Sequence, residues 1–355
     1  MNGGGPAAST VAWTAEDVRA FLGLYGRAPE RLAVEQLRSW WCNTVLRVDA
    51  DGQQLVLRRY GLTPAEEVRW ELAILLHLGE HAFPTIAPLA HGGPGAADAT
   101  DAYLAEFLGC PAILYPYIEG HNACEGRVEP GRAIPQTAAT VARLHELTAG
   151  LVVPHPRVRS GTESRRLLRE FLAYAAQRDV SIPEPALADL LLRVERMERY
   201  LTSRIASYAD RPSDLPRGIV HHDAHCANVL FHDNRLVALI DFDDACEGYL
   251  VSDLAAMVAN WAATWGGRTA LDPERAALIV REYARHRPLT AVERDLLPDF
   301  VAAFVLADAT AYIRVRLAQG AHGDTAVHES QTYRRFLHQA GDPARLRELR
   351  RMLTP

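Results

Sequence analysis

The residues with the clearest chemical potential lie between His221 and Asp241. Asp223 follows His221 by two residues, Asn228 follows Asp223 by five, and Asp241 follows Asn228 by thirteen. The carboxylate of Asp223 suits the acceptance of a proton, and the oxygens of Asn228 and Asp241 suit a hard divalent cation. Phosphoryl transfer needs this combination, because it depends on a carboxylate at the attacking hydroxyl and a separate oxygen cluster around a phosphate-bound Mg²⁺.

A β-hairpin is predicted to bring these groups together. Residues 228–231 (Asn-Val-Leu-Phe) and 236–240 (Leu-Val-Ala-Leu-Ile) are the predicted strands, and the polar stretch 232–235 is the turn between them. The returning strand carries Asp241 back to the start of the first strand, and Asp223 lies just before that start. We therefore expect the reactive groups to surround one point.

The same order of residues occurs in protein kinases, where H-x-D-x-x-x-x-N is followed by a D-F-G turn. Here residues 221–231 (H-H-D-A-H-C-A-N-V-L-F) precede I-D-F-D-D-A at 240–245 and S-D-L-A at 252–255. This series resembles the aminoglycoside phosphotransferase superfamily, which includes type II homoserine kinases and choline kinases and usually has H-G-D-x-H-x-x-N-x-L, I-D-F/W-x-x-A and D-L-A. The F-D-D-A segment favours the homoserine kinase branch, and His222 takes the place of the common Gly.

The resemblance implies a protein-kinase-like fold and a role for each residue of the pattern. Asp223 would be the catalytic base, and His221 would brace the loop through hydrogen bonds. Asn228 and Asp241 would hold Mg²⁺ at the phosphates of ATP or GTP.

Further polar residues near the centre have supporting or substrate-binding roles by the same resemblance. His225 matches the second His of the family loop, and Asp253 matches the carboxylate of D-L-A, so both would support the loop. Asp243 would assist a second metal or bind a cationic group of the acceptor, with Glu247 as a further candidate for the latter. The alternative for Asp243 is that it only caps the turn after the strand. For Asp244 we expect only such a capping role.

Upstream, alternating apolar residues predict a five-stranded antiparallel sheet. The predicted strands are 37–41, 44–48, 54–60, 102–107 and 111–117. Thr14 is predicted to cap a short first helix, and Thr63-Pro64-Ala65-Glu66 predicts a capping box at the start of a second one.

By the resemblance, this sheet would bind the nucleotide. Val56 would lie under the base and Arg58 would reach the phosphates, in place of the Lys usual in the family. The alternative is that Arg58 is a solvated strand end. Asn43 is the one residue retained from a G-x-x-N phosphate loop, and a plain hairpin is the alternative at that position.

Two further parts of the nucleotide site follow from the resemblance. Glu71 on the second helix would hold the Arg58 side chain, with Glu67 as its competitor and a solvated carboxylate as the alternative. Tyr115 and Tyr117 flank the predicted hinge between two lobes, where backbone groups would pair with the base.

The rest of the chain is predicted to be mainly helical. Predicted helices lie at 136–147, 164–177, 185–210 and 300–319, and two more begin at Asp272 and Thr290. The fold prediction is a bilobal α+β protein. It consists of a disordered tail (1–12), a nucleotide-binding lobe (13–118) and a helical lobe with the catalytic hairpin (119–355).

Composition describes an ordinary globular protein without a nucleic-acid or membrane partner. The formal net charge is −6, and all 38 basic residues are Arg. Five cysteines without a C-x-x-C pair favour reduced thiols in the cytoplasm. The first residues lack the features of a signal peptide, and apolar runs fall short of the roughly 18 residues that span a bilayer. We expect a cytoplasmic monomer or homodimer.

The predicted activity is Mg²⁺-dependent transfer of a nucleotide γ-phosphate to a hydroxyl of a small polar molecule. An aminoglycoside or other hydroxylated antibiotic is the first expected acceptor, and homoserine or another amino alcohol is the second. One rival is a nucleotide-binding protein without catalysis, suggested by the missing Lys and the glycine-poor loop. The other is a metal-dependent hydrolase, whose ligands would be His221, His222, Asp223 and His225.

Overall fold

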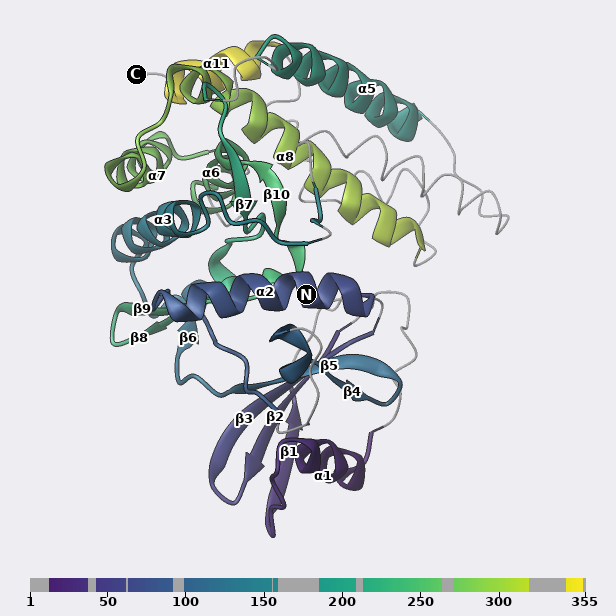
Figure 1. The fold of residues 1–355 in the computed structure, drawn as a ribbon. Helices are drawn as coiled ribbons and strands as arrows, with labels where there is room; N and C mark the ends of the chain where they lie inside the picture. The colour runs from purple at the N-terminus through teal and green to yellow at the C-terminus, as the bar shows by residue number, and fades with distance from the viewer. Residues whose placement is uncertain are drawn as a thin grey trace.

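The computed structural model describes residues 13–37, 43–61, 63–91, 99–154, 156–158, 185–208, 213–263, 271–318 and 343–353. The tail predicted for 1–12, the helix predicted for 164–177 and most of the strand predicted for 37–41 lie outside the described residues. Within them the chain forms a sheet-containing part and a helical part, with one long helix between the two (Figure 1).

Five antiparallel strands form the N-terminal sheet, in the order β1-β2-β3-β5-β4. The strands are β1 (Leu32–Gln36), β2 (Asn43–Ala50), β3 (Gln53–Tyr60), β4 (Ala105–Phe107) and β5 (Cys110–Pro116). The predicted sheet is therefore confirmed, but its first strand begins at Leu32 rather than Leu37. The reason is packing, since Leu32 and Val34 alternate with polar residues and lie against the core under the first helix.

The two faces of β3 are buried in different cores, as the period of two predicts. Leu55 and Leu57 join the core formed with α1 (Ala15–Leu24), whereas Val56 and Tyr60 contact the core shared with the helical part. The first helix begins as expected, because Thr14 and Asp17 form a capping box.

The helix α2 (Ala65–Glu80) runs between the sheet and the helical part (Figure 1). Its buried residues include Val68, Leu72 and Leu75, as the apolar stripe predicts. The predicted capping box at its start is wrong. The backbone of Pro64 stays extended (φ −61°, ψ 151°), so Pro64 itself is the N-cap and the Thr63 hydroxyl lies one residue too early to cap the helix.

The predicted catalytic hairpin consists of β8 (Val229–His232) and β9 (Arg235–Leu239). Asp233 and Asn234 form its turn, with φ values of 47° and 62°, so the turn has two residues rather than the four expected. The short strand β6 (His121–Asn122) extends this hairpin to three strands, and β7 (Arg217–Val220) pairs with β10 (Cys246–Tyr249) beside it.

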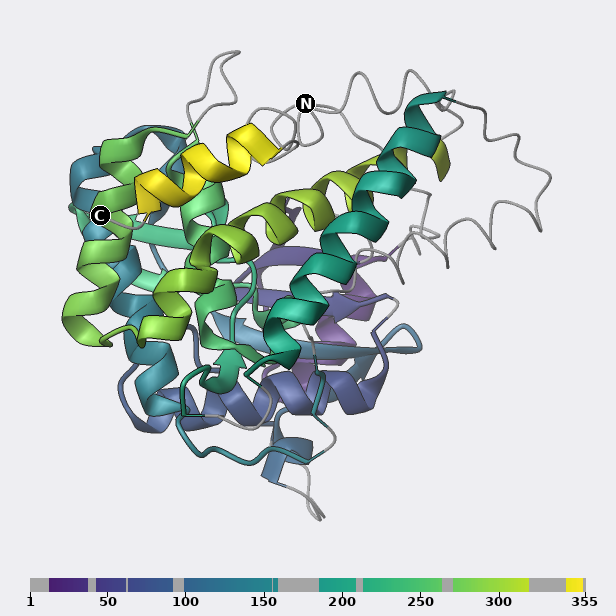
Figure 2. The same ribbon diagram turned by 90° about the horizontal axis from the view of Figure 1, so that it is seen from above.

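Helices make up most of the remaining described residues. They are α3 (Pro130–Leu147), α5 (Pro185–Ala206), α6 (Leu250–Trp261), α7 (Pro273–His286), α8 (Ala291–Ala318) and α11 (Pro343–Leu353). The two helices predicted to begin at Thr290 and Phe300 are one helix, α8. The helix α3 begins at Pro130, where a proline is tolerated, and continues through Pro135 rather than beginning at Gln136. Figure 2 shows α5 and α11 lying along α8.

The core of the helical part extends under α2. Val68 and Leu72 of α2 belong to the same buried cluster as Val229 of the hairpin and Leu254 of α6. The sheet and α1 form a second, smaller cluster. Of the helices described, none is both long and apolar enough to cross a lipid bilayer.

Candidate active site

Asp223 and Asn228 face each other across the loop between β7 and β8. The amide nitrogen Nδ2 of Asn228 donates to the carboxylate Oδ2 of Asp223 at 2.8 Å and to the Asp223 carbonyl at 3.0 Å. The short 3₁₀ helix η3 (Cys226–Asn228) sets this geometry. Because the amide nitrogen is engaged with Asp223, the amide oxygen of Asn228 is directed to the other side, where it can serve a cation.

Asp253 fixes the start of this loop from α6. Its buried carboxylate accepts backbone hydrogen bonds from His221 and His222, both at 2.7 Å, and lies 3.0 Å from Nε2 of His145. Burial disfavours the charge of Asp253, but the hydrogen bonds from His145 and the loop hold its pKa below the usual range. His145 is in turn bonded to the hydroxyl of Tyr283 at 2.6 Å, so α3, α6 and α7 all position the loop.

His222 adopts a left-handed backbone conformation, with φ of 67°. Residues with a Cβ atom rarely adopt it, whereas glycine does so without strain. The Gly of the family pattern falls at this position, so the pattern has a direct conformational explanation. Asp253 bonds the backbone N–H of His222, which holds the residue in this conformation.

His221 and His225 use their ring nitrogens within the loop. The backbone N–H of Asp223 donates to Nδ1 of His221 at 3.2 Å, so Nε2 carries the proton and donates to the carbonyl of Ile240 at 3.0 Å. His225 accepts from the N–H of Ala227 at 3.0 Å, and its Nε2 lies 3.5 Å from the Asp223 carboxylate. Both nitrogens of His221 are thus occupied, which argues against His221 as a ligand in the rival metal-dependent hydrolase.

Asp241 lies beside this loop because β8 and β9 still pair at the open end of the hairpin, opposite its turn. The N–H of Ile240 donates to the carbonyl of Asn228 at 2.9 Å. Asp241 then takes a left-handed conformation (φ 70°) at the residue before the 3₁₀ helix η4 (Phe242–Asp244), without a capping hydrogen bond from its side chain. Phe242 packs its ring against His221, with 4.6 Å between the ring centroids. The predicted return of Asp241 to Asn228 matches this geometry.

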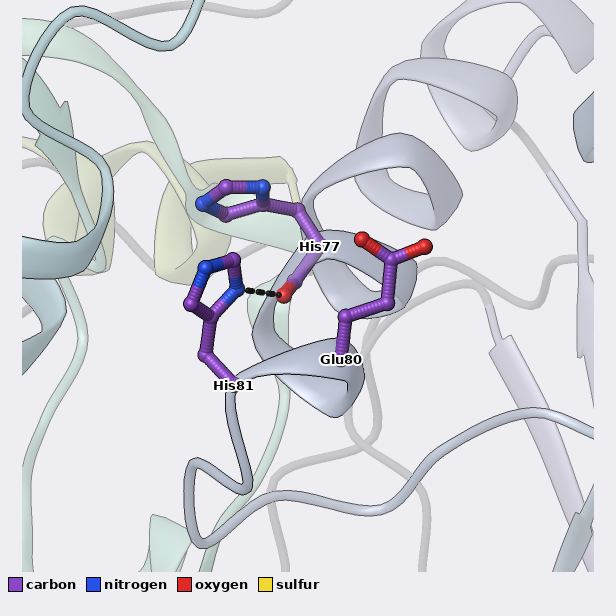
Figure 3. Close-up of side chains that lie close together, drawn as sticks. All are labelled: His77, Glu80 and His81. Atoms are coloured by element: carbon purple, nitrogen blue, oxygen red, sulfur yellow. Dashed lines mark hydrogen bonds between the residues drawn. The ribbon is translucent and has the colours of Figure 1, made fainter.

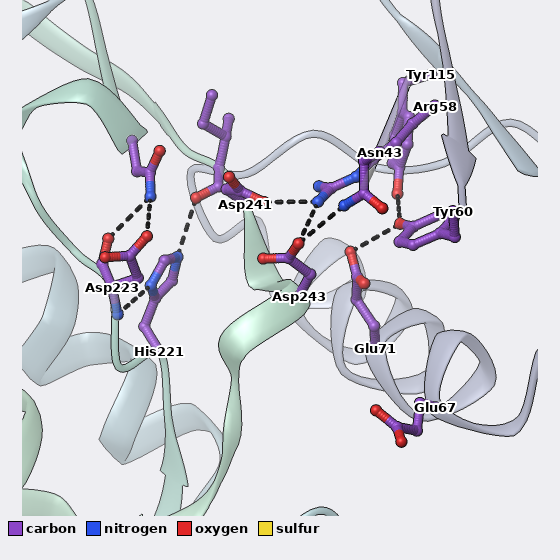
Figure 4. Close-up of polar contacts among 12 residues, drawn as sticks. Asn43, Arg58, Tyr60, Glu67, Glu71, Tyr115, His221, Asp223, Asp241 and Asp243 are labelled. Atoms are coloured by element: carbon purple, nitrogen blue, oxygen red, sulfur yellow. Dashed lines mark hydrogen bonds and ion pairs between the residues drawn. The ribbon is translucent and has the colours of Figure 1, made fainter. Parts of the chain in front are cut away.

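Arg58 reaches from β3 to the acidic residues of this turn (Figure 4). Its terminal nitrogen Nη2 donates to Asp241 at 2.7 Å and to Asp243 at 2.8 Å. Asn43 on β2 donates to the same carboxylate oxygen of Asp243 at 3.0 Å. The two neighbouring strands and the turn after β9 therefore converge on a shared polar cluster.

Two carboxylates around a single guanidinium have opposite pKa shifts. Burial raises the pKa of Asp243 to about 8, and the nearby charges of Asp241 and Glu71 add to the effect against the attraction of Arg58. Asp241 is also penalised by burial, but Arg58 holds its pKa below the usual range. The cluster therefore carries more potential negative charge than Arg58 alone neutralises, and it suits an additional cation.

Glu71 is buried beside this cluster but, contrary to expectation, it does not hold Arg58 by a hydrogen bond. Its carboxylate accepts from the hydroxyl of Tyr60 at 3.0 Å, and Tyr60 in turn lies 3.4 Å from the hydroxyl of Tyr115. Burial raises the pKa of Glu71, against the attraction of Arg58. The prediction fails because Asp241 and Asp243 offer the guanidinium closer partners.

Sequence reasoning missed Arg157. This residue lies in the segment beside β10 and bonds both the carboxylate of Glu67 on α2 and the backbone carbonyl of Asp243. Glu67 is thus engaged with Arg157 rather than Arg58. No pattern in the sequence marks Arg157, because its partners lie far away along the chain. Tyr60 was also missed, although strand alternation places it on the face of Arg58.

The remaining predicted residues lie at the edges of this region. Val56 is half-buried and pairs with Tyr115 across β3 and β5. The backbone N–H of Tyr117 donates to Gln54 at 3.1 Å, and Glu247 pairs through its backbone with Arg157.

The donors around Asp241 fit both a divalent cation and a phosphate. Carboxylate and amide oxygens from the turn and the loop are the ligands that Mg²⁺ prefers. Arg58 Nε and Asn43 Oδ1 are buried without a hydrogen-bond partner among the described residues. Unpaired buried polar atoms are rare in proteins, and a phosphate oxygen or its bound cation would satisfy them.

Comparisons with known proteins agree with this geometry. The chain matches the sequence model of the phosphotransferase enzyme family over residues 33–289. A homoserine kinase of Pseudomonas aeruginosa is 31% identical over 196 residues, which are 54% of this chain and 55% of that protein, so this match spans about half of the relative's length. A homoserine kinase of a Caulobacter species is 26% identical over 296 residues, covering 80% of this chain and 81% of that protein.

Solved structures with the same fold include several kinases of small molecules. An amicoumacin kinase in complex with AMP-PNP and Ca²⁺ has a TM-score of 0.66 at 18% identity, covering 97% of this chain and 96% of that one. A microcompartment-associated aminopropanol kinase has a TM-score of 0.66 at 17% identity, covering 92% and 96%. These likenesses confirm the predicted bilobal α+β fold, and with the match over residues 33–289 the chain belongs to the phosphotransferase enzyme family.

Proposed function

We propose that this protein transfers the γ-phosphate of ATP or GTP to a hydroxyl group of a small amino alcohol. The observation that carries the proposal is the convergence of Asp223, Asn228 and Asp241 at the open end of one hairpin, opposite its turn, with Arg58 reaching the same point. At this point Asp223 can receive the proton of a hydroxyl acceptor, Asn228 and Asp241 can bind a cation, and Arg58 can bind a triphosphate.

Each of these residues has one task in the proposed reaction. The acceptor oxygen attacks the γ-phosphorus, the bond to the β–γ bridging oxygen breaks, and the nucleoside diphosphate leaves. Asp223 receives the proton of the attacking hydroxyl, while Asn228 orients its carboxylate through the 2.8 Å hydrogen bond. Asn228 and Asp241 would hold Mg²⁺, which when bound neutralises charge on the phosphates.

Arg58 would change partners when the nucleotide binds. Its Nη2 atom bonds Asp241 and Asp243, while its buried Nε lacks a partner among the described residues. A phosphate would accept from the guanidinium, and Asp241 would then be released to the cation and Asp243 to the acceptor. Guanidinium thus serves in place of the family Lys, which supports catalysis rather than a silent nucleotide-binding protein.

The sequence relatives favour an amino alcohol such as homoserine as the acceptor. Homoserine kinases match this chain at 25% to 31% identity, whereas aminoglycoside phosphotransferases of known structure, which would suggest an antibiotic acceptor, are 16% to 20% identical. The antibiotic, expected first from the sequence, therefore becomes the second candidate. Asp243 and Glu247 are the proposed partners for the acceptor amine, and the cytoplasm remains the proposed compartment.

A nucleotide-consumption screen tests the proposal. Purified protein with ATP or GTP and Mg²⁺ is assayed against homoserine, other amino alcohols and aminoglycosides, with phosphorylated products identified by mass spectrometry. We expect turnover with an amino alcohol, and a decrease of roughly 10²–10⁴ in Asp223→Asn with nucleotide affinity nearly unchanged. Asp233→Asn, at the exposed hairpin tip, is the matched control. Turnover of Asp223→Asn at the wild-type rate would refute the role of Asp223.

A further inference from the structure

A second cluster of ligand-type side chains lies at the C-terminal end of α2, away from the proposed active site (Figure 3). His77, Glu80 and His81 each offer one ligand atom, and these three atoms lie within 4.8 Å of one another. The cluster follows Glu71 by about two helical turns, roughly 9 Å along the axis. The proposed phosphotransfer uses none of its residues.

The hydrogen bonds of both imidazoles determine which nitrogen is free to bind a metal. Nε2 of His77 lies 2.8 Å from the carbonyl of Leu147, and Nδ1 of His81 lies 2.8 Å from the carbonyl of His77. A carbonyl only accepts, so these two nitrogens carry the protons. His77 Nδ1 and His81 Nε2 therefore keep their lone pairs. Metal-binding histidines typically have this arrangement, with the second ring nitrogen bonded to a carbonyl or carboxylate.

The local charge also favours a cation. The cluster lies where α2 ends at Glu80 and α3 ends at Leu147, so the negative ends of two helix dipoles meet there. Arg143 is the nearby cation, but its guanidinium donates to the backbone carbonyls of His81 and Ala82 rather than to the ligand side chains. Arg143 therefore does not compete with a metal ion for the side chains of His77, Glu80 and His81.

We propose that His77, Glu80 and His81 bind Zn²⁺ or a transition-metal ion of similar ligand preference. Two imidazoles and a carboxylate are typical zinc ligands, and the spacing H-x-x-E-H places both histidines on one helix face. Ligand atoms around tetrahedral zinc lie about 3.3–3.5 Å apart, given bonds of roughly 2.0–2.2 Å. Glu80 is exposed, so its side chain can close the remaining distance by rotation while His81 keeps its hydrogen bond to the His77 carbonyl.

Zinc at this position would fasten α2 to α3. His77 would bond the metal through one nitrogen and the last residue of α3 through the other. The ion would therefore stiffen the contact between the helix that carries Glu71 and the helical part of the protein.

Equilibrium dialysis of the full-length protein against Zn²⁺ tests this site, with excess Mg²⁺ present to occupy the oxygen ligands of the proposed active site. Bound zinc is counted by elemental analysis. The wild type should bind one equivalent, and His81→Gln should bind at least tenfold more weakly. His286→Gln is the matched control, because His286 is likewise an exposed histidine at the C-terminal end of a helix.

The visible absorption of bound Co²⁺ gives a second readout of the same ligands. A wild type with intense tetrahedral bands that are lost in His81→Gln and kept in His286→Gln supports the site. Absence of bound zinc in the wild type overturns the proposal, and so does wild-type affinity in His81→Gln. Circular dichroism without metal verifies that both variants are folded.

Discussion

Replacing Arg58 with methionine should destabilise the metal-free protein and at the same time strengthen its binding of Mg²⁺. The guanidinium donates to Asp241 at 2.7 Å and to Asp243 at 2.8 Å, so it occupies Asp241, the carboxylate that Mg²⁺ would use. Methionine keeps much of the aliphatic side chain but lacks the charge. The two carboxylates are then left without their counter-ion until a metal arrives.

The size of both effects follows from these contacts. A hydrogen bond between charged groups contributes about 1.5–3 kcal/mol, and a broken buried ion pair costs about 3–5 kcal/mol. The side chain of Arg58 is 13% exposed, but those of Asp241 and Asp243 are 38% and 28% exposed, so water offsets part of the loss. We expect the free energy of unfolding to fall by about 2–3 kcal/mol. In the wild type, Mg²⁺ must break the Arg58–Asp241 hydrogen bond, which costs about 2 kcal/mol. The variant has no such bond, so its Mg²⁺ binding should be roughly 30-fold tighter.

Isothermal titration of Mg²⁺ into nucleotide-free protein measures this affinity, and urea unfolding measures the stability. Arg59→Met is the control, because Arg59 lies on the opposite face of β3 and bonds the carbonyl of Phe107. That variant should lose stability without a change in Mg²⁺ affinity. If Arg58→Met binds Mg²⁺ no more tightly than the wild type, Arg58 does not compete for the metal ligands and the reasoning is wrong.

Two further predictions concern buried carboxylates. The pKa of Glu71 is raised by burial, so the folded state retains a proton that the unfolded state releases above about pH 4.3, and this contribution to stability is lost as the pH rises. Glu71→Gln should therefore reduce the fall in unfolding free energy between pH 5 and 8, measured with urea; an unchanged slope would contradict this. Asp253→Ala leaves two loop N–H groups and His145 without their acceptor, and should lower the free energy of unfolding by about 3–5 kcal/mol. A loss below about 1 kcal/mol in the same assay would show that water replaces the carboxylate.

The centre of the site was predictable because it is local in sequence. Asp223, Asn228 and Asp241 lie within one loop and one hairpin, and the spacing of strand residues fixes how the hairpin closes. The turn was predicted to have four residues, but it has two. A two-residue turn is possible because Asp233 and Asn234 tolerate the left-handed conformation that it requires.

The partners of Arg58 were not predictable, because they are separated from it by 183 and 185 residues. Alternation placed Arg58 on the correct face of β3, but it could not rank Glu71 against two acidic residues from the other lobe. That choice depends on distances between elements that no local pattern encodes. The role of Arg157 was not predicted for the same reason, since its hydrogen bonds join α2 to the turn after β9.

The guanidinium of Arg58 at the proposed nucleotide site has a practical consequence for chemical probing. Nucleotide analogues designed to acylate a side-chain amine have no target in this chain, since all 38 of its basic residues are Arg. Dicarbonyl reagents, which modify guanidinium groups, are the appropriate choice. Protection of Arg58 from such a reagent by nucleotide would report occupancy of the proposed nucleotide site directly.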